Sequence, residues 1–141
     1  MAIAILYPAL AQIVLTLVVL LGMGLQRNKA LRSGAVTVDD IALDSTRWPA
    51  HARQFGNCYA NQFELPVLFY ALCLIAQVTH AADLIMVIFA WIFVVSRIAH
   101  AYVHTTSNVV RLRANMFILG FVALVVMTVL LLFRLLLTAS I

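Results

Sequence analysis

Two stretches of this chain place polar and ionisable side chains at the spacing of helix turns. The first contains Arg53, Asn57, Asn61 and Glu64, separated by 4, 4 and 3 residues. At about 100° per residue, these four side chains fall within about 80° of arc on one helix face. They combine hydrogen-bonding amides with one charge of each sign, which is a composition suited to a polar binding site.

The second stretch contains Arg97, His100, His104, Asn108 and Arg111, separated by 3, 4, 4 and 3 residues. If this stretch is helical, these side chains also share about 80° of arc. An Arg inside a membrane span costs about 2.5–3.5 kcal/mol on insertion scales, so its presence suggests a function. We expect the two faces to meet, within one chain or between subunits, in a positively biased pocket that opens to the cytoplasm.

Structural roles would also explain these residues. Glu64 and Arg97 could form an interhelical ion pair without further function. His100 and His104 could form hydrogen bonds between helices. Their spacing also suits a metal, but no third ligand is evident and the HExxH pattern is absent, so no metal site is predicted.

The composition determines which elements carry these faces. Hydrophobic residues make up 65% of the 141 residues and charged residues 10%. A soluble domain cannot bury that much apolar side chain, and a disordered chain has the opposite composition. Two cysteines are too few for a disulfide framework.

Four unbroken apolar stretches are long enough to cross a membrane, over residues 3–25, 64–82, 84–104 and 114–137. They predict an all-α fold, an integral membrane four-helix bundle that forms a single transmembrane domain. A long loop, residues 26–60, joins the first two spans.

Positive charge predicts how the bundle is oriented. The first loop contains Arg27, Lys29, Arg32, Arg47 and Arg53. The third loop adds two arginines, whereas the second loop has no Lys or Arg. The positive-inside rule therefore predicts cytoplasmic first and third loops and two non-cytoplasmic termini. It also explains the net charge of +4 without nucleic acid, and Arg53, Arg111 and Arg113 could be simple membrane anchors.

At the two polar faces the sequence resembles bacterial-type members of the MAPEG family, the membrane-associated proteins in eicosanoid and glutathione metabolism. One passage is Asn61-Gln-Phe-Glu64-Leu-Pro66, similar to the Asn-x-x-Glu and nearby Pro at the start of the family's second helix. The other is Arg97, His100, His104 and Arg111, similar to the Arg, aromatic or His, Tyr and Arg of its third helix and beyond.

The resemblance implies a homotrimer in a bacterial inner membrane, with glutathione bound between neighbouring subunits near the cytoplasmic face. The residues that would line this site are Arg53, Asn57, Asn61, Glu64, Arg97, His100, His104 and Arg111. Arg27 or Arg32 would activate the thiol. Two positions depart from the family pattern, because Asn57 stands where an Arg is common and His104 where a Tyr is usual.

The implied function is a glutathione-dependent transferase or peroxidase that acts on lipophilic electrophiles arriving through the bilayer. The thiolate is the nucleophile, and lowering the thiol pKa by two units requires about 2.7 kcal/mol. One Arg in a partly dry site can supply that amount, and His100 or His104 could donate a proton.

Other functions remain open at the level of sequence. Glu64 would suit a small proton-coupled transporter if it lay near the middle of the membrane. His100 and His104 suggest a haem-binding electron carrier, although both histidines lie on one helix. The chain could also be a family scaffold without catalysis that binds a lipid or an anion.

Overall fold

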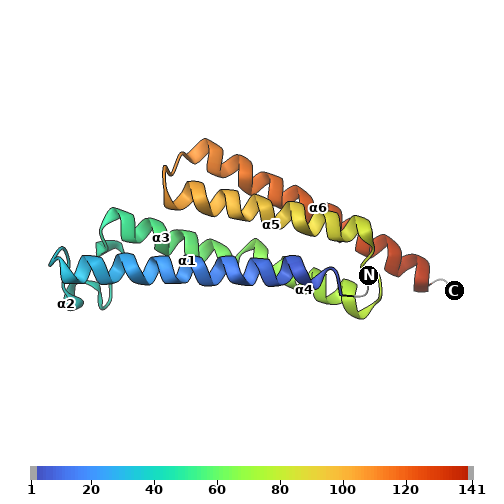
Figure 1. The fold of residues 1–141 in the computed structure, drawn as a ribbon, viewed down its shortest axis with the longest axis horizontal. Helices are drawn as coiled ribbons and strands as arrows, with labels where there is room; N and C mark the ends of the chain where they lie inside the picture. The colour runs from blue at the N-terminus through green and yellow to red at the C-terminus, as the bar shows by residue number, and fades with distance from the viewer. Residues whose placement is uncertain (1–2, 140–141) are drawn as a thin grey trace.

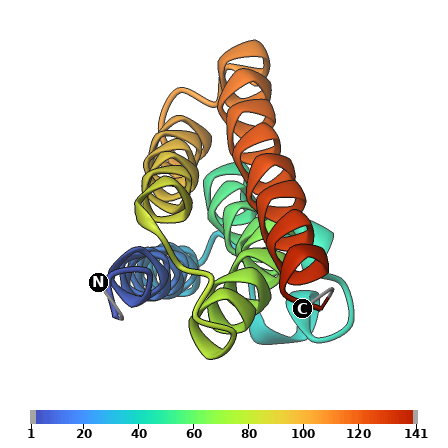
Figure 2. The ribbon, with the colours of Figure 1, turned by 90° about the vertical axis from the view of Figure 1, so that its right-hand side faces the viewer.

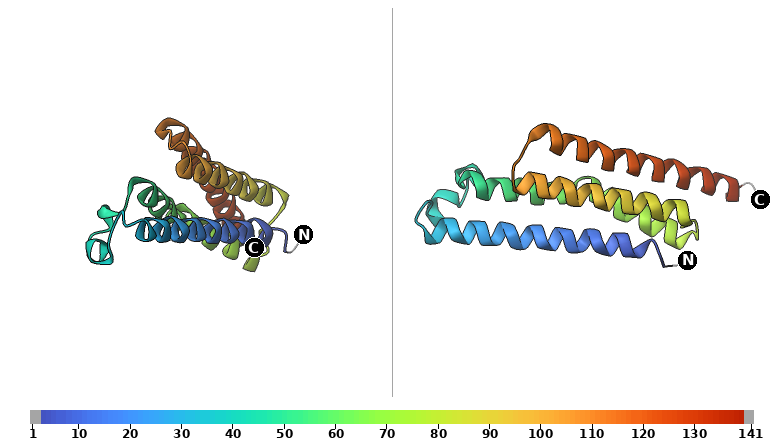
Figure 3. Two further views of the ribbon diagram at one scale, coloured as in Figure 1. Left: turned by 60° about the vertical axis from the view of Figure 1, so that its left-hand side comes forward. Right: turned by 45° about the horizontal axis from the view of Figure 1, so that its top comes forward.

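The computed structural model describes residues 3–139, which form helices joined by short turns and one longer loop. The start of the first helix and the end of the last lie at one end of the bundle, while the loop that follows residue 32 and the turn that follows residue 105 lie at the other end (Figures 1 and 3). In chain order the elements are α1 (Leu6–Arg32), α2 (Val38–Ile41), η1 (Ser45–Arg47), α3 (Ala50–Ala60), η2 (Asn61–Phe63), α4 (Leu65–Val78), α5 (Leu84–Thr105) and α6 (Val110–Ala139).

Four stretches are long and apolar enough to cross a membrane: Leu6–Arg32, Ala50–Val78, Leu84–Thr105 and Val110–Leu137. Large apolar side chains cover their outer faces, for example Leu21, Leu74, Val95 and Leu132. Such a surface is stable only against lipid or another subunit. The structure thus confirms the predicted all-α membrane four-helix bundle, and the protein is an integral, multi-pass membrane protein.

The second span begins earlier than the sequence suggested. Helical structure starts at Ala50, whereas we expected the loop to reach residue 60 and the span to start at residue 64. The reason is that α3 is amphipathic, with polar residues on its outer face, so an unbroken apolar run does not reveal it. The first loop is correspondingly shorter than expected.

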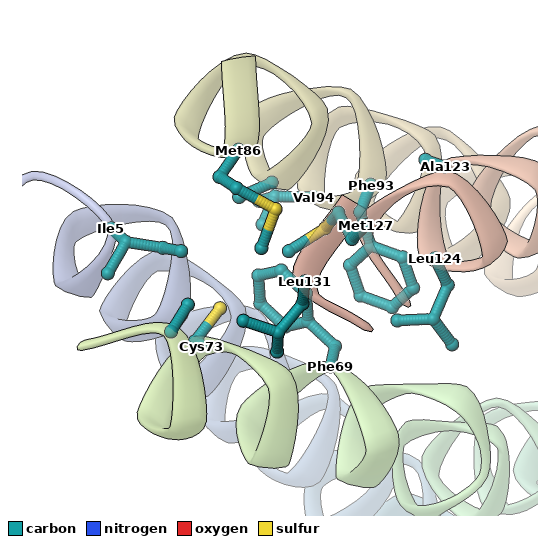
Figure 4. Packing of buried hydrophobic residues seen from close by; sticks show 12 residues of the cluster. Ile5, Phe69, Cys73, Met86, Phe93, Val94, Ala123, Leu124, Met127 and Leu131 are labelled. Carbon is teal, nitrogen blue, oxygen red and sulfur yellow. The ribbon is translucent and has the colours of Figure 1, made fainter. Parts of the chain in front are cut away.

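The end-on view in Figure 2 shows the four spans gathered into one bundle. The core near the terminal end is built from α4, α5 and α6, with Ile5 packed beside them (Figure 4). Phe69 of α4 stacks on Phe93 of α5 with ring centres 4.3 Å apart. At the same end Arg134 of α6 pairs with Asp83, which caps α5, so the only charge late in the fourth span is neutralised locally.

Two glycines allow close approach between helices. A Cβ atom at Gly120 would lie 2.6 Å from the Ser96 hydroxyl, so α6 contacts α5 closely at this level. A Cβ atom at Gly22 would lie 2.5 Å from the ring of Phe55, so α1 contacts α3 in the same way. Larger residues would push these helices apart.

A kink divides the second span between α3 and α4. The α-helix tightens into a 3₁₀ turn at η2, and Glu64 has non-helical dihedral angles of φ −93° and ψ −105°. Pro66 follows in the first turn of α4. Because proline has no N–H and disfavours the helical conformation of the residue before it, the kink leaves backbone carbonyl groups without their usual helical partners.

The loop between α1 and α3 is ordered by short-range polar contacts. Thr37 caps α2 and forms reciprocal hydrogen bonds with Asp40. Arg47 pairs with both Asp40 and Asp44. The hydrogen bonds from Thr37 hold the pKa of Asp40 below its usual value, with a further contribution from Arg47. Trp48 is buried and anchors the loop to α1 and α3.

Candidate functional site

The kink of the second span opens a cleft against α5 and α6, which we call the kink cleft. Its volume is about 350 Å³. Its polar lining consists of Asn61, Glu64, His100 and Arg113, and Phe117 contributes an aromatic wall. Three segments that are distant in sequence therefore supply one cation, one carboxylate, an imidazole and an amide to the same space.

Arg97 contacts two of these lining residues from the interior. Its Nη2 donates a 3.0 Å hydrogen bond to the backbone carbonyl of Asn61 at the kink. Its guanidinium carbon lies 5.7 Å from the centre of the Phe117 ring, within the range of a cation–π contact. The side chain is 0% exposed, and its Nε and Nη1 are buried without a hydrogen-bond partner. A buried guanidinium with two free donors is stabilised strongly by any anion within reach.

His100 has a defined tautomer. Its Nδ1 lies 3.0 Å from the backbone carbonyl of Arg113, and a carbonyl oxygen only accepts, so Nδ1 carries the hydrogen. Neutral His100 therefore has a lone pair on Nε2, which is buried and without a partner. That nitrogen can accept a proton from a molecule bound in the cleft.

His104 lies one turn further along α5, with its ring edge-on to that of His100 at 5.5 Å. Its Nδ1 is 3.5 Å from the side-chain amide nitrogen of Asn61, which links α5 to η2. Gln54 of α3 donates a second link, a 2.6 Å hydrogen bond to the His104 carbonyl. His104 thus connects the second and third spans beside the cleft.

The second predicted polar face does not continue beyond His104 as one helix. Helix α5 ends at Thr105, and Asn108 adopts a left-handed conformation with φ 50° in the turn to α6. From there its side-chain oxygen accepts a 2.8 Å hydrogen bond from Arg113, and this bond directs Arg113 toward the cleft. Arg111 lies on α6 with an exposed side chain. Arg113, considered from the sequence as an anchor, is the arginine that lines the kink cleft.

Glu64 is exposed at the rim of the kink cleft. In residues 3–137 it forms no ion pair with Arg97, so the structural pair considered from the sequence is not present there. Glu64 precedes α4, whose 14 residues rise about 21 Å. In a hydrocarbon layer of about 30 Å, this places the cleft about two-thirds of the way from the terminal end of the bundle.

A second cleft of about 500 Å³ lies beside it at the loop end of the bundle, and we call it the loop cleft. Its lining includes Arg27 of α1, Arg53 and Asn57 of α3, and Trp48. The guanidinium carbon of Arg27 is 5.1 Å from the Trp48 ring centre. Arg32 lies outside both clefts with an exposed side chain.

Most of the residues predicted from the two patterns and from the family resemblance therefore form two groups. One group surrounds the kink cleft: Asn61, Glu64, Arg97, His100 and His104. The other lines the loop cleft: Arg27, Arg53 and Asn57. Sequence reasoning did not identify the buried pair formed by Gln12 of α1 and Gln62 of η2, which are joined by a 3.0 Å hydrogen bond that fixes the kink against α1. A polar amide inside the first apolar span was the available signal for it.

No group of three His, Cys, Asp or Glu side chains among the described residues could share a metal ion. Comparison with known protein families gives one result: the family model described as the MAPEG family matches residues 5–133. Searches of curated proteins and of solved structures gave no match.

Proposed function

Since this chain belongs to the MAPEG family, we propose that it binds glutathione or a related small thiol in the kink cleft and transfers the thiolate to a lipophilic electrophile. A lipid hydroperoxide is an alternative substrate: the thiolate would attack its terminal oxygen, the lipid alcohol would leave, and a second thiol would convert the resulting sulfenic acid to a disulfide and water. The family is associated with glutathione, and the polar groups around the kink cleft are those that a small zwitterionic thiol requires.

The observation that carries the proposal is the environment of Arg97. It is a completely buried cation, one of its donors is bound to the Asn61 carbonyl and two others are without a partner. In a protein interior such donors favour a bound anion far more than they would in water. A thiolate or carboxylate placed beside Arg97 would satisfy them.

The remaining groups have distinct proposed roles. Arg113 would pair with a carboxylate of the thiol compound, and Glu64 would accept hydrogen bonds from its amine. Nε2 of His100 would take the proton of the thiol, since Nδ1 is already committed to the Arg113 carbonyl. A carbon–sulfur bond then forms at the electrophile, and the proton returns to the leaving group or to the adduct.

Lipophilic substrates would reach this cleft from the bilayer. Val110 and Ile118 border it with exposed apolar surfaces, and the outer faces of the neighbouring helices are apolar as well. The cleft thus joins a polar interior to a surface that dissolves hydrophobic molecules. This arrangement suits an enzyme whose two substrates differ greatly in polarity.

We also propose that the protein is a homotrimer in a bacterial inner membrane, with the loop end of the bundle in the cytoplasm. The exposed carboxylate of Glu64 and the exposed ring of Phe63 face outward from a single chain, where a neighbouring subunit could cover them. Light scattering of the detergent-solubilised protein, corrected for bound detergent, would measure the number of chains. A monomer that binds the thiol fully would contradict an intersubunit site.

The function is tested by thermal unfolding in detergent with millimolar glutathione, with other small thiols, and with a thioether analogue. We expect stabilisation by glutathione that is lost in Arg97→Leu and reduced at least tenfold in apparent affinity in Glu64→Gln. Arg111→Gln is the matched control, because it removes one exposed positive charge from the same end of the bundle. Failure of every thiol to stabilise the wild-type protein would overturn the proposal.

A further inference from the structure

The loop cleft has features of a site that the proposed thiol chemistry does not use. It lies between α1 and α3 and is closed by the segment from Ser45 to Trp48. Arg27 and Arg53 line it from two different helices. The Arg27 guanidinium stacks against buried Trp48, and its Nε is a buried donor without a hydrogen-bond partner. A cavity of about 500 Å³ can accept a group of the size of a substituted phosphate.

The charge of the loop cleft is not neutralised by the acidic residues of the loop. Asp40 and Asp44 are both paired with Arg47. Neither Arg27 nor Arg53 takes part in an ion pair within residues 3–137. Two guanidinium groups that share one cleft repel each other, and a bound anion reverses that repulsion. Ser45 and Thr46 at the rim supply hydroxyl groups that can also donate to anionic oxygens.

The position of the cleft indicates the source of the anion. Two turns below Arg27 and on the same side of α1, Leu20 presents an apolar side chain that is 36% exposed. Trp48 and Tyr59 line the cleft, and such amphipathic rings are typical of the membrane–water boundary. An anion bound here would therefore lie at headgroup level, with an apolar helix surface beside it for acyl chains.

We propose that the loop cleft binds the phosphate of an anionic phospholipid. Arg27 and Arg53 are its ligands, and the acyl chains lie against the apolar outer surface of α1. The inference goes beyond the proposed thiol chemistry and does not depend on it. The shared chemistry is a phosphate group, which could come from a lipid or from a water-soluble compound.

The experiment titrates the purified full-length protein in neutral detergent with dihexanoyl phosphatidylglycerol, dihexanoyl phosphatidylcholine or inorganic phosphate at constant ionic strength. We expect the anionic lipid to raise the unfolding temperature and to bind at least tenfold more tightly than the other two probes. Arg27→Gln/Arg53→Gln should weaken this binding at least tenfold. Arg53→Gln alone should weaken it at least threefold, and this variant leaves the contact between Arg27 and Trp48 intact because Arg53 is exposed. Lys29→Gln/Arg32→Gln is the matched control, since it removes the same charge from exposed positions in the last turn of α1.

The outcomes separate the alternatives. Binding of inorganic phosphate that equals the lipid and is lost in the Arg27→Gln/Arg53→Gln variant would support the phosphate site but assign it to a soluble ligand. If the anionic lipid binds equally to Arg27→Gln/Arg53→Gln and to the control Lys29→Gln/Arg32→Gln, the proposed site is overturned, because only the overall positive charge would then attract the lipid. Displacement of the lipid by saturating glutathione would also overturn it, since the loop cleft would then be part of the thiol site. Loss of glutathione binding in Arg97→Leu with lipid binding retained would separate the two clefts.

Discussion

The kink cleft and the loop cleft are lined by successive parts of the second span and are similar in composition, yet the cations at each are held in different ways. Each combines arginine, amide and aromatic side chains. Behind the lining of the kink cleft, Arg97 is fully buried and is fixed by a backbone carbonyl and a ring. In the loop cleft, Arg27 is half-buried, Arg53 is exposed, and a short ordered loop forms one wall.

This difference shows how arginine can serve either catalysis or the binding of a lipid headgroup, depending on how firmly its side chain is held. A cation that cannot move and cannot be hydrated is suited to stabilising a charge that develops during a reaction. Cations at the membrane boundary can adjust to headgroups of different shape, and salt weakens their interactions. The kink at Pro66 produces the first environment, whereas the loop after α1 produces the second.

The largest expected effect concerns His100, which tests whether the kink cleft is catalytic. In His100→Asn, the amide nitrogen can still donate to the Arg113 carbonyl, as Nδ1 does now, but the proton acceptor at Nε2 is removed. We expect turnover of glutathione with a lipophilic electrophile to fall about 100-fold, within the usual range for loss of a general base. Thiol binding, measured by calorimetry, should change less than threefold. Full activity in His100→Asn would exclude His100 as the base.

The second prediction tests whether the kink positions Arg97. In Pro66→Ala the helix can continue, so the Leu65 N–H can compete with Arg97 for the Asn61 carbonyl. We expect glutathione affinity to fall about tenfold in a calorimetric titration, while lipid binding at the loop cleft is unchanged. Pro8→Ala is the matched control, because Pro8 is also buried in the first turn of a helix but lies near the terminal end of the bundle, away from the kink. Unchanged affinity in a natively folded Pro66→Ala protein would show that the kink is not required.

The third prediction compares two close helix–helix contacts, that of α5 with α6 at Gly120 and that of α1 with α3 at Gly22. Gly120→Ala should reduce the free energy of unfolding by about 1–3 kcal/mol, because the new methyl group would clash with Ser96 inside the α5–α6 contact. Gly22→Ala should cost less, since the half-buried ring of Phe55 can turn aside. Gly24→Ala meets nothing within 4 Å and should be neutral or stabilising by about 0.5–1 kcal/mol. Denaturant titration in mixed micelles measures all three, and an equal loss at the three positions would contradict the close packing at Gly120 and Gly22.

The smallest expected effect concerns acid pH at the loop cleft. The pKa of Asp40 lies below its ordinary 3.8 because of its hydrogen bonds with Thr37, and that of Asp44 is lowered chiefly by Thr46. A lowered pKa in the folded state stabilises the loop above about pH 3.8, and this stabilisation is lost as the pH falls through the folded value. In Trp91→Phe, where Trp48 is the sole tryptophan, emission should shift to the red below that pH.

The control for this last effect replaces both carboxyl groups. In Trp91→Phe/Asp40→Asn/Asp44→Asn, the emission of Trp48 should no longer change between pH 5 and the acid limit of the titration. A transition that persists there, or one centred above pH 4, would show that other groups control the order of the loop.

The sequence by itself determined the class of the protein and the polar residue types available to the proposed site. Unbroken apolar runs leave a helical membrane bundle as the one way to satisfy the backbone in lipid. The Arg97–His104 spacing placed three side chains on one face of α5, because that helix is continuous over this segment. The Asn61–Glu64 spacing falls on the 3₁₀ turn and the kink, where α-helical periodicity no longer applies. The long amphipathic start of the second span was underestimated, because its polar face interrupts the apolar pattern.

Tertiary structure alone decided which of these side chains share a space. Helical periodicity ends where a helix ends, so the turn at Asn108 separates Arg111 from the face it was assigned to and brings Arg113 to the cleft. The division into two clefts likewise depends on the kink and on the approach of α5 to α6, which involve contacts between residues far apart in the chain. The spacing of residues along the chain determines which side chains share one face of a helix. How deeply a side chain is buried, and which residues it contacts, depend on how whole helices pack against one another.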